Sequence, residues 1–264
     1  MSEIAIPSDA EIAALVIGLY AYPGYAPVAW DHLEQPEQDD GICWSLKRVG
    51  QIDVVVLRGS MTPQDWFRDL DALADPFPSK LHRIEDWLHY VGFALDAIPT
   101  RHAFLGPVHP GFLAGMEDAW AAMLPMLGAN VVVAGHSLGA ARSAILTGLM
   151  VHDGHPPLAC VSFGQPRPGF PALAELIAGV PQRSYQNGTT DRVLVDMITE
   201  VPLAIGAEDY VHPRPLIPVC EPPSTASITA RGIFAWHGMA LYLRAVERLA
   251  GVAPRAATAD ALDA

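Results

Sequence analysis

Residues 131–150 read VVVAGHSLGAARSAILTGLM, and this stretch decides the fold that we expect. Its first four residues, VVVA, are apolar and mostly β-branched, which is typical of a buried strand. The residues from Leu138 to Met150 are rich in Ala and Leu and predict a helix. The pentapeptide GHSLG (135–139) joins the two, so a strand runs into a tight turn and a helix runs out of it.

The GHSLG turn fits the pattern G-x-S-x-G, in which the serine has a strained backbone conformation between strand and helix. Gly135 and Gly139 are needed there because a Cβ atom would collide with the neighbouring strand and helix. The turn lifts the serine hydroxyl clear of the sheet, and the helix N-terminus favours negative charge developing nearby. A tight turn without chemistry is the alternative. We predict that Ser137 is a nucleophile.

Elements alternate on both sides of this stretch. IDVVVL (52–57) and LACVSF (158–163) predict two further buried strands, and two more candidates lie at 183–186 and 216–219. Helical patterns cover residues 9–20, 63–73, 84–97, 111–126, 171–178 and 239–249. This alternation predicts the α/β class, with a mostly parallel central sheet and helices on both faces, as in the α/β-hydrolase fold. We expect a single domain over residues 1–251 and a disordered Ala-rich tail over 252–264.

Composition excludes several function classes. The 264 residues include 16 basic and 29 acidic side chains, and the net charge of −13 would repel nucleic acid and anionic membrane surfaces. The first ten residues, MSEIAIPSDA, do not resemble a secretory signal, and no apolar run is long enough to span a membrane, so we expect a cytoplasmic protein. Cys43, Cys160 and Cys220 are widely spaced, which predicts buried free thiols rather than a disulfide framework or a zinc site.

A serine nucleophile needs a base, and a histidine base needs a carboxylate that fixes its tautomer. In this architecture the acid follows the serine along the chain, and the candidates are Asp191, Asp196 and Asp209. Asp191 follows the strand candidate RSYQ and the polar loop NGTT, so it stands just beyond a strand end, where a triad acid belongs. Asp196 lies inside the apolar run VLVDMI and would be costly to bury unpaired. We predict Asp191 as the acid, with an Asx-turn or a helix cap as the alternative.

The histidines that follow the serine are His152, His155, His212 and His237. His237 stands in AWHG (235–238), a loop directly before the last predicted helix, which suits a base that reaches over a nucleophile. His212 is the rival, but a histidine between Val and Pro at a strand edge is often only packed and hydrogen-bonded. We predict His237 as the base.

Several separated motifs in this order resemble the class 3 lipases of the fungal triacylglycerol lipase type, from about Val54 to Tyr242. They are VVLRGS (55–60), TPQDWFRDL (62–70), VHPGF (108–112), GHSLG (135–139), SFGQPRPG (162–169), Asn187 with DRV (191–193), and His237 with Tyr242. The resemblance implies the triad of Ser137, Asp191 and His237. It also implies that Ser60, together with the backbone amide of Leu138, holds the oxyanion.

The stretch at 62–70 resembles the lid segment of that family. Trp66, Phe67 and Leu70 would share one face of a short helix, closing an apolar cleft in water and turning outward at a lipid surface. An ordinary amphipathic helix packed on the core is the alternative.

Together these features predict a serine carboxylester hydrolase, a lipase or esterase that cleaves lipid or other apolar acyl esters through an acyl-enzyme. No metal and no organic cofactor is needed for this chemistry. The expected partner is a small ester or lipid substrate, with at most transient contact with lipid surfaces and no nucleic acid. The alternatives are an acyltransferase or amidase on the same triad, and a non-catalytic lipid-binding relative.

Overall fold

The computed structural model describes residues 4–22, 24–35, 42–59, 99–202, 209–225, 227–228 and 232–252. Several predictions therefore fall outside the described residues: the helices at 63–73 and 84–97, the role of Ser60, the lid residues Trp66, Phe67 and Leu70, and the tail beyond residue 252.

A seven-stranded sheet forms the centre of the molecule. Across it the strands follow the order β1 (His32–Glu34), β2 (Trp44–Val49), β3 (Ile52–Leu57), β6 (Val131–His136), β7 (Ala159–Phe163), β8 (Gln182–Asn187) and β9 (Ile217–Val219). Strands β1, β2 and β3 pair antiparallel, and every pair from β3 to β9 is parallel. A separate two-stranded ribbon pairs β4 (Thr100–His102) with β5 (Gly106–Val108). The predicted α/β class with a mostly parallel sheet is confirmed.

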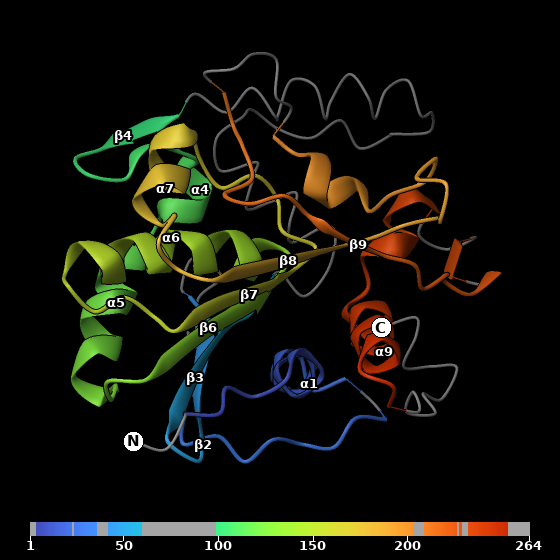
Figure 1. Ribbon diagram of the computed structural model, residues 1–264, viewed down its shortest axis with the longest axis horizontal. Coiled ribbons are helices and arrows are strands. Elements are labelled where there is room, and N and C mark those ends of the chain that lie inside the picture. Colours follow the sequence, from blue (N-terminus) through green and yellow to red (C-terminus); the bar gives the residue numbers. More distant parts are fainter. Residues whose placement is uncertain are drawn as a thin grey trace.

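Helices cover both faces of this sheet (Figure 1). On one face lie α4 (Pro110–Leu113), α5 (Met116–Met123), α6 (Leu138–His152) and α7 (Pro171–Leu176), and on the other lie α1 (Asp9–Leu19) and α9 (Met239–Leu249). A hydrophobic core lies on each face of the sheet, and strand β3 contributes to both. Val55 and Leu57 pack toward α6, and Val54 and Val56 pack toward α1. Burial on both faces explains why β3, β6 and β7 are apolar without alternation.

The structure corrects two details of the sequence prediction. The helix expected over 111–126 is divided into α4, α5 and the 3-10 helix η1 (Leu124–Met126). Gly115, which adopts a left-handed conformation with φ 72°, separates α4 from α5. All three cysteines are free, but only Cys43 and Cys160 are buried, whereas Cys220 is exposed.

The carboxyl ends of β6, β7 and β8 lie side by side because the strands are parallel and in register. His136 pairs with Phe163, and Phe163 pairs with Tyr185. Ser137 and Gly164 directly follow β6 and β7, and Asn187 ends β8, so the chain brings its candidate site to one edge of the sheet. Among the described helices, none has the length and apolar character needed to cross a lipid bilayer.

Candidate active site

Ser137 occupies a strained turn between β6 and α6, with φ 60° and ψ −130°. Its backbone N–H donates to the carbonyl of Phe163 at 3.0 Å, which fixes the turn to the neighbouring strand. A Cβ atom on Gly135 would stand 2.3 Å from the carbonyl oxygen of Gly139, and one on Gly139 would stand 2.1 Å from that of Leu57. The predicted collision at both glycines is therefore confirmed, and the turn tolerates no side chain at either position.

The end of β3 lies directly against this turn. A Cβ atom on Gly59 would stand 2.6 Å from the carbonyl oxygen of His136 and 2.9 Å from Cβ of Ser137. Leu138 begins α6, and the first amides of a helix have no acceptor within the helix. The Leu138 amide therefore stands next to the nucleophile candidate, at the positive end of the helix dipole.

His237 ends the 3-10 helix η3 (Gly232–His237), just before α9. Its Nδ1 atom lies 2.7 Å from Oδ2 of Asp196. Since a carboxylate accepts, Nδ1 carries a ring proton, and in the neutral tautomer this leaves the lone pair on Nε2. Nε2 is buried, and no described residue forms a hydrogen bond with it. The Ser137 hydroxyl is among the groups that do not bond to it. Such contacts often form only once a substrate is bound.

Two packing contacts bring His237 to the Ser137 turn. The ring of His136, the residue before Ser137, stacks on the ring of His237 with centroids 4.5 Å apart. Gly164, the residue after the hydrogen-bond partner of Ser137, lies so close that a Cβ atom there would stand 2.8 Å from Cε1 of His237. Ser137 and His237, predicted as nucleophile and base, are thus neighbours in the structure.

The structure corrects the predicted partner of His237 from Asp191 to Asp196. Asp191 is exposed and accepts from the Thr189 hydroxyl and the Val193 amide, which is the local turn that we weighed as the alternative. Asp196 is 1% exposed, and it is paired rather than unpaired: its carboxylate accepts from His237, from the Tyr242 hydroxyl at 2.5 Å and from the Ile198 amide at 3.0 Å. These three donors remove the objection to burying it.

The electrostatic environment keeps Asp196 ionised. Burial raises the pKa of its carboxyl group, but the adjacent His237 and the hydrogen bonds from His237 and Tyr242 outweigh burial and hold that pKa below the ordinary value. An ionisable residue inside an apolar run is itself a signal of a functional site, and this signal could have identified Asp196 from the sequence.

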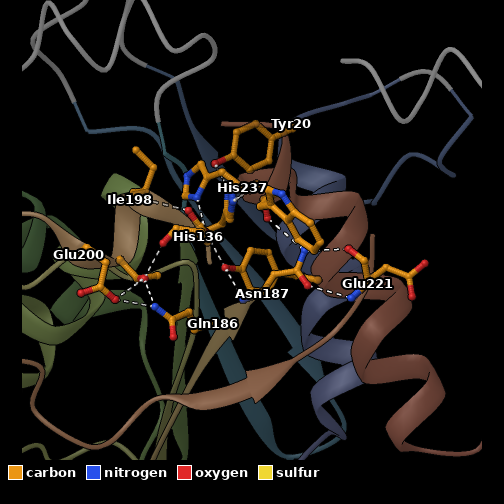
Figure 2. A network of polar contacts seen from close by, with 12 residues as sticks. Tyr20, His136, Gln186, Asn187, Ile198, Glu200, Glu221 and His237 are labelled. Atoms are coloured by element: carbon orange, nitrogen blue, oxygen red, sulfur yellow. Dashed lines mark hydrogen bonds and ion pairs between the residues drawn. The ribbon is translucent and has the colours of Figure 1, made fainter. Parts of the chain in front are cut away.

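Asn187, at the end of β8, connects Asp196 to the loop that carries His237 (Figure 2). Its carbonyl accepts from the Asp196 amide at 2.8 Å, and its side-chain amide donates to the carbonyl of Trp236 at 3.1 Å and to that of Glu221 at 2.9 Å. Since Trp236 precedes His237, one asparagine holds the backbone beside both members of the pair.

His212, the rival base, is a packed residue. Its Nε2 atom lies 2.9 Å from the carbonyl oxygen of Thr199, and neither ring nitrogen bonds to Asp196 or Ser137. Burial, aided by nearby Arg167, lowers the pKa of His212 to about 4.

The strained serine turn in a mostly parallel sheet, with a buried Asp–His pair beside it, defines an α/β-hydrolase. The model of the family described as Lipase (class 3) matches residues 54–204, more than half of the chain, so the chain belongs to the class 3 lipase family. This confirms the resemblance seen in the sequence and places the chain among the ester hydrolases.

Solved structures of fungal lipases have the same fold. A mutant form of MDLA from Penicillium cyclopium is 17% identical with a TM-score of 0.56, and the match covers 84% of this chain and 86% of that one. The mono- and diacylglycerol lipase of Aspergillus oryzae is 16% identical with a TM-score of 0.53, covering 83% of each chain. The triacylglyceride lipase of Rhizomucor miehei is 20% identical with a TM-score of 0.51, covering 80% of this chain and 77% of that one.

In its propeptide complex, the Rhizomucor miehei lipase is matched over only 66% of its chain. No curated protein matches the sequence.

Proposed function

We propose that this protein hydrolyses esters of lipids or other apolar acyl groups, with Ser137 as nucleophile, His237 as base and Asp196 as the acid that orients the base. The observation that carries the proposal is the 2.7 Å contact between Nδ1 of His237 and the buried carboxylate of Asp196, beside the strained Ser137 turn. Membership of the lipase family supports the same reaction class.

In the proposed reaction, Nε2 of His237 takes the proton of the Ser137 hydroxyl as its oxygen attacks the ester carbonyl carbon. The imidazolium that forms is stabilised by the Asp196 carboxylate, which the Tyr242 hydroxyl and the Ile198 amide keep ionised and fixed. His237 then returns the proton to the leaving alcohol, and water releases the acyl group from Ser137 by the same route.

The tetrahedral oxygen would be held by the backbone amide of Leu138 and, as the sequence resemblance implies, by Ser60. A donor of this kind contributes roughly 3 kcal/mol to the transition state in comparable sites. The position of Leu138 at the start of α6 supports its part in this proposal.

Acylglycerols are the substrate class that we favour. The similar solved structures include a triacylglyceride lipase and a mono- and diacylglycerol lipase, and the class 3 family is named for lipase activity. The proposed lid of Trp66, Phe67 and Leu70 would serve such a substrate. Rates on esters of increasing chain length, measured below and above their solubility limits, test both ideas, because a lidded lipase gains activity when the ester forms a separate phase.

The direct test compares Ser137→Ala with Ser45→Ala. Ser45 is fully buried in β2, and its hydroxyl has no hydrogen-bond partner among the described residues, so its removal is a matched control. We expect Ser137→Ala to lower kcat on a p-nitrophenyl ester by about 10⁶-fold without unfolding the protein, because a triad without its nucleophile retains little catalysis. Ser45→Ala should keep wild-type rates.

A fluorophosphonate probe gives a second measurement, since it labels an activated serine without needing the natural substrate. The wild type and Ser45→Ala should be labelled, and Ser137→Ala should not. Ester hydrolysis or labelling that persists in Ser137→Ala would remove the proposal.

A further inference from the structure

A buried chain of hydrogen bonds connects the end of β3 with the loop that carries His237, and it runs through Tyr20 and His136 (Figure 2). The Gly59 amide donates to the Tyr20 hydroxyl oxygen at 3.0 Å. The Tyr20 hydroxyl lies 2.9 Å from Nδ1 of His136, and Nε2 of His136 lies 2.7 Å from the carbonyl oxygen of His237. The segments that carry Tyr20, His136 and His237 are far apart in the sequence, and they meet at the His136 imidazole.

Each bond in this chain has a single direction. A carbonyl oxygen only accepts, so Nε2 of His136 carries a proton. Burial, with a further contribution from nearby His237, lowers the pKa of His136 to about 3, so its ring is neutral at neutral pH and Nδ1 accepts. The Tyr20 hydroxyl must then donate to Nδ1, and it keeps its proton because burial raises the pKa of Tyr20 far above the ordinary value. The Gly59 amide supplies the last donor.

His136 also constrains the ring of His237. The two imidazoles stack with centroids 4.5 Å apart and planes 28° apart, so one face of the His237 ring is covered. With Asp196 on Nδ1, the proposed base is held at its ring nitrogen, its ring face and its backbone carbonyl. Nε2 is the atom left available to take a proton.

The other end of the chain holds the backbone next to the proposed oxyanion donor. Gly59 immediately precedes Ser60, and its amide is fixed by the Tyr20 hydroxyl. His136 immediately precedes Ser137. Tyr20 and His136 thus hold the His237 loop and the Gly59 backbone in fixed positions relative to the residue that precedes Ser137.

We propose that Tyr20 and His136 are positioning residues for the ester hydrolysis proposed above, holding the His237 carbonyl and the Gly59 backbone in fixed geometry around Ser137. This inference rests on the proposed function for its catalytic consequence, but the bond directions can be measured without any activity. Neither residue is expected to touch the substrate's reacting atoms, so binding should be little affected when they are changed.

The test variant is Tyr20→Phe, which keeps the ring and removes the hydroxyl that both Gly59 and His136 use. We expect kcat to fall about 10- to 100-fold with KM changed less than about threefold, because small misplacements of reacting groups cost rates of this size. Fluorophosphonate labelling of Ser137 should slow by a similar factor. Tyr185→Phe is the control, since the Tyr185 hydroxyl donates to the Asp9 carboxylate and not to any member of this chain of bonds.

Two substitutions at His136 provide a graded comparison. His136→Gln keeps a donor for the His237 carbonyl, whereas His136→Phe keeps only the stacked ring. We expect kcat to decrease in the order wild type, His136→Gln, His136→Phe, with KM again nearly constant. If Tyr20→Phe fails to fold, this series decides the inference in its place.

Nitrogen-15 NMR of the histidine rings in Ser137→Ala measures the network independently of activity. We expect His136 as the neutral Nε2–H tautomer, and a shift of its Nδ1 resonance when Tyr20→Phe removes the donated bond. If wild type and Ser137→Ala are equally inactive but these signals appear, the proposed function fails and the network stands. An Nδ1–H tautomer, or an active Tyr20→Phe variant with wild-type kcat, would overturn the positioning role.

Discussion

Replacement of Asp196 by Asn is the most informative single perturbation, because it removes one charge and reverses one hydrogen bond without changing size. In the native protein, Oδ2 of Asp196 accepts from Nδ1 of His237 at 2.7 Å and from the Tyr242 hydroxyl at 2.5 Å, while Oδ1 accepts from the Ile198 amide at 3.0 Å. A carboxamide has one acceptor oxygen for these three donors.

Either orientation of the new amide fails. If its NH2 group replaces Oδ2, it faces the His237 ring, which must move its proton from Nδ1 to Nε2 in order to accept. His237 can then no longer take the Ser137 proton. If the NH2 group replaces Oδ1, it faces the Ile198 amide, and a buried donor loses its acceptor, which costs roughly 1–3 kcal/mol of stability.

The magnitude follows from the loss of the correct tautomer. In a serine triad with the same change, kcat falls about 10⁴-fold, which corresponds to roughly 5 kcal/mol of transition-state stabilisation. The matched variant is Asp191→Asn. Asp191 is exposed and, among the described residues, bonds only within its own turn, so kcat should stay within about threefold and stability within about 0.5 kcal/mol of wild type.

The assay is p-nitrophenyl ester hydrolysis under saturating substrate, with urea unfolding of each variant to separate catalysis from folding. A larger loss of kcat in Asp191→Asn than in Asp196→Asn would refute the assignment of the acid. Equal, small losses in both would refute the proposed triad as a whole.

Two further predictions concern stability. Burial lowers the pKa of His136 to about 3 and that of His109 to about 4, below the unfolded value, so the unfolded chain binds protons first on acidification. Each of these two histidines should therefore lower the free energy of unfolding by up to about 2 kcal/mol as the pH falls from about 6.5 to about 5. A free energy of unfolding that stays constant over this range would contradict the reasoning. Gly139→Ala places a Cβ atom 2.1 Å from the Leu57 carbonyl oxygen, which should lower the free energy of unfolding by about 3 kcal/mol and slow fluorophosphonate labelling. The control Gly179→Ala, where no atom of the described part of the chain lies within 4 Å of the new Cβ, should change neither quantity.

The sequence predicted those features that local pattern determines. The β-branched run before GHSLG and the Ala- and Leu-rich run after it correspond to β6 and α6, because burial on both faces requires such composition. The strands β1 and β2 were missed, since β2 reads WSLKRV and its exposed half carries charge rather than an apolar run. The break at Gly115 depends on one residue's φ, which periodicity does not report.

Local pattern marks Asp196 as an ionisable residue inside an apolar run, but it does not show which side chains pair with it. Asp196 is tolerated in an apolar run only because His237 and Tyr242 return to it from 41 and 46 residues further along the chain. Asp191 has the polar, turn-like setting expected of a triad acid, but its two partners, Thr189 and Val193, are each only 2 residues away. Asp191 therefore satisfied a local criterion, whereas the site is built from distant segments.

The bond from the Asp196 amide to the Asn187 carbonyl, together with the bridge between Gly188 and Val195, closes the segment between them at its base. The tip of that segment is exposed, with Val193 at 76% and Leu194 at 51% accessibility. Entry and exit of this loop are thus fixed independently of what lies between them. A protein engineer could lengthen the tip or graft a peptide epitope there while the Asp196 carboxylate keeps its position.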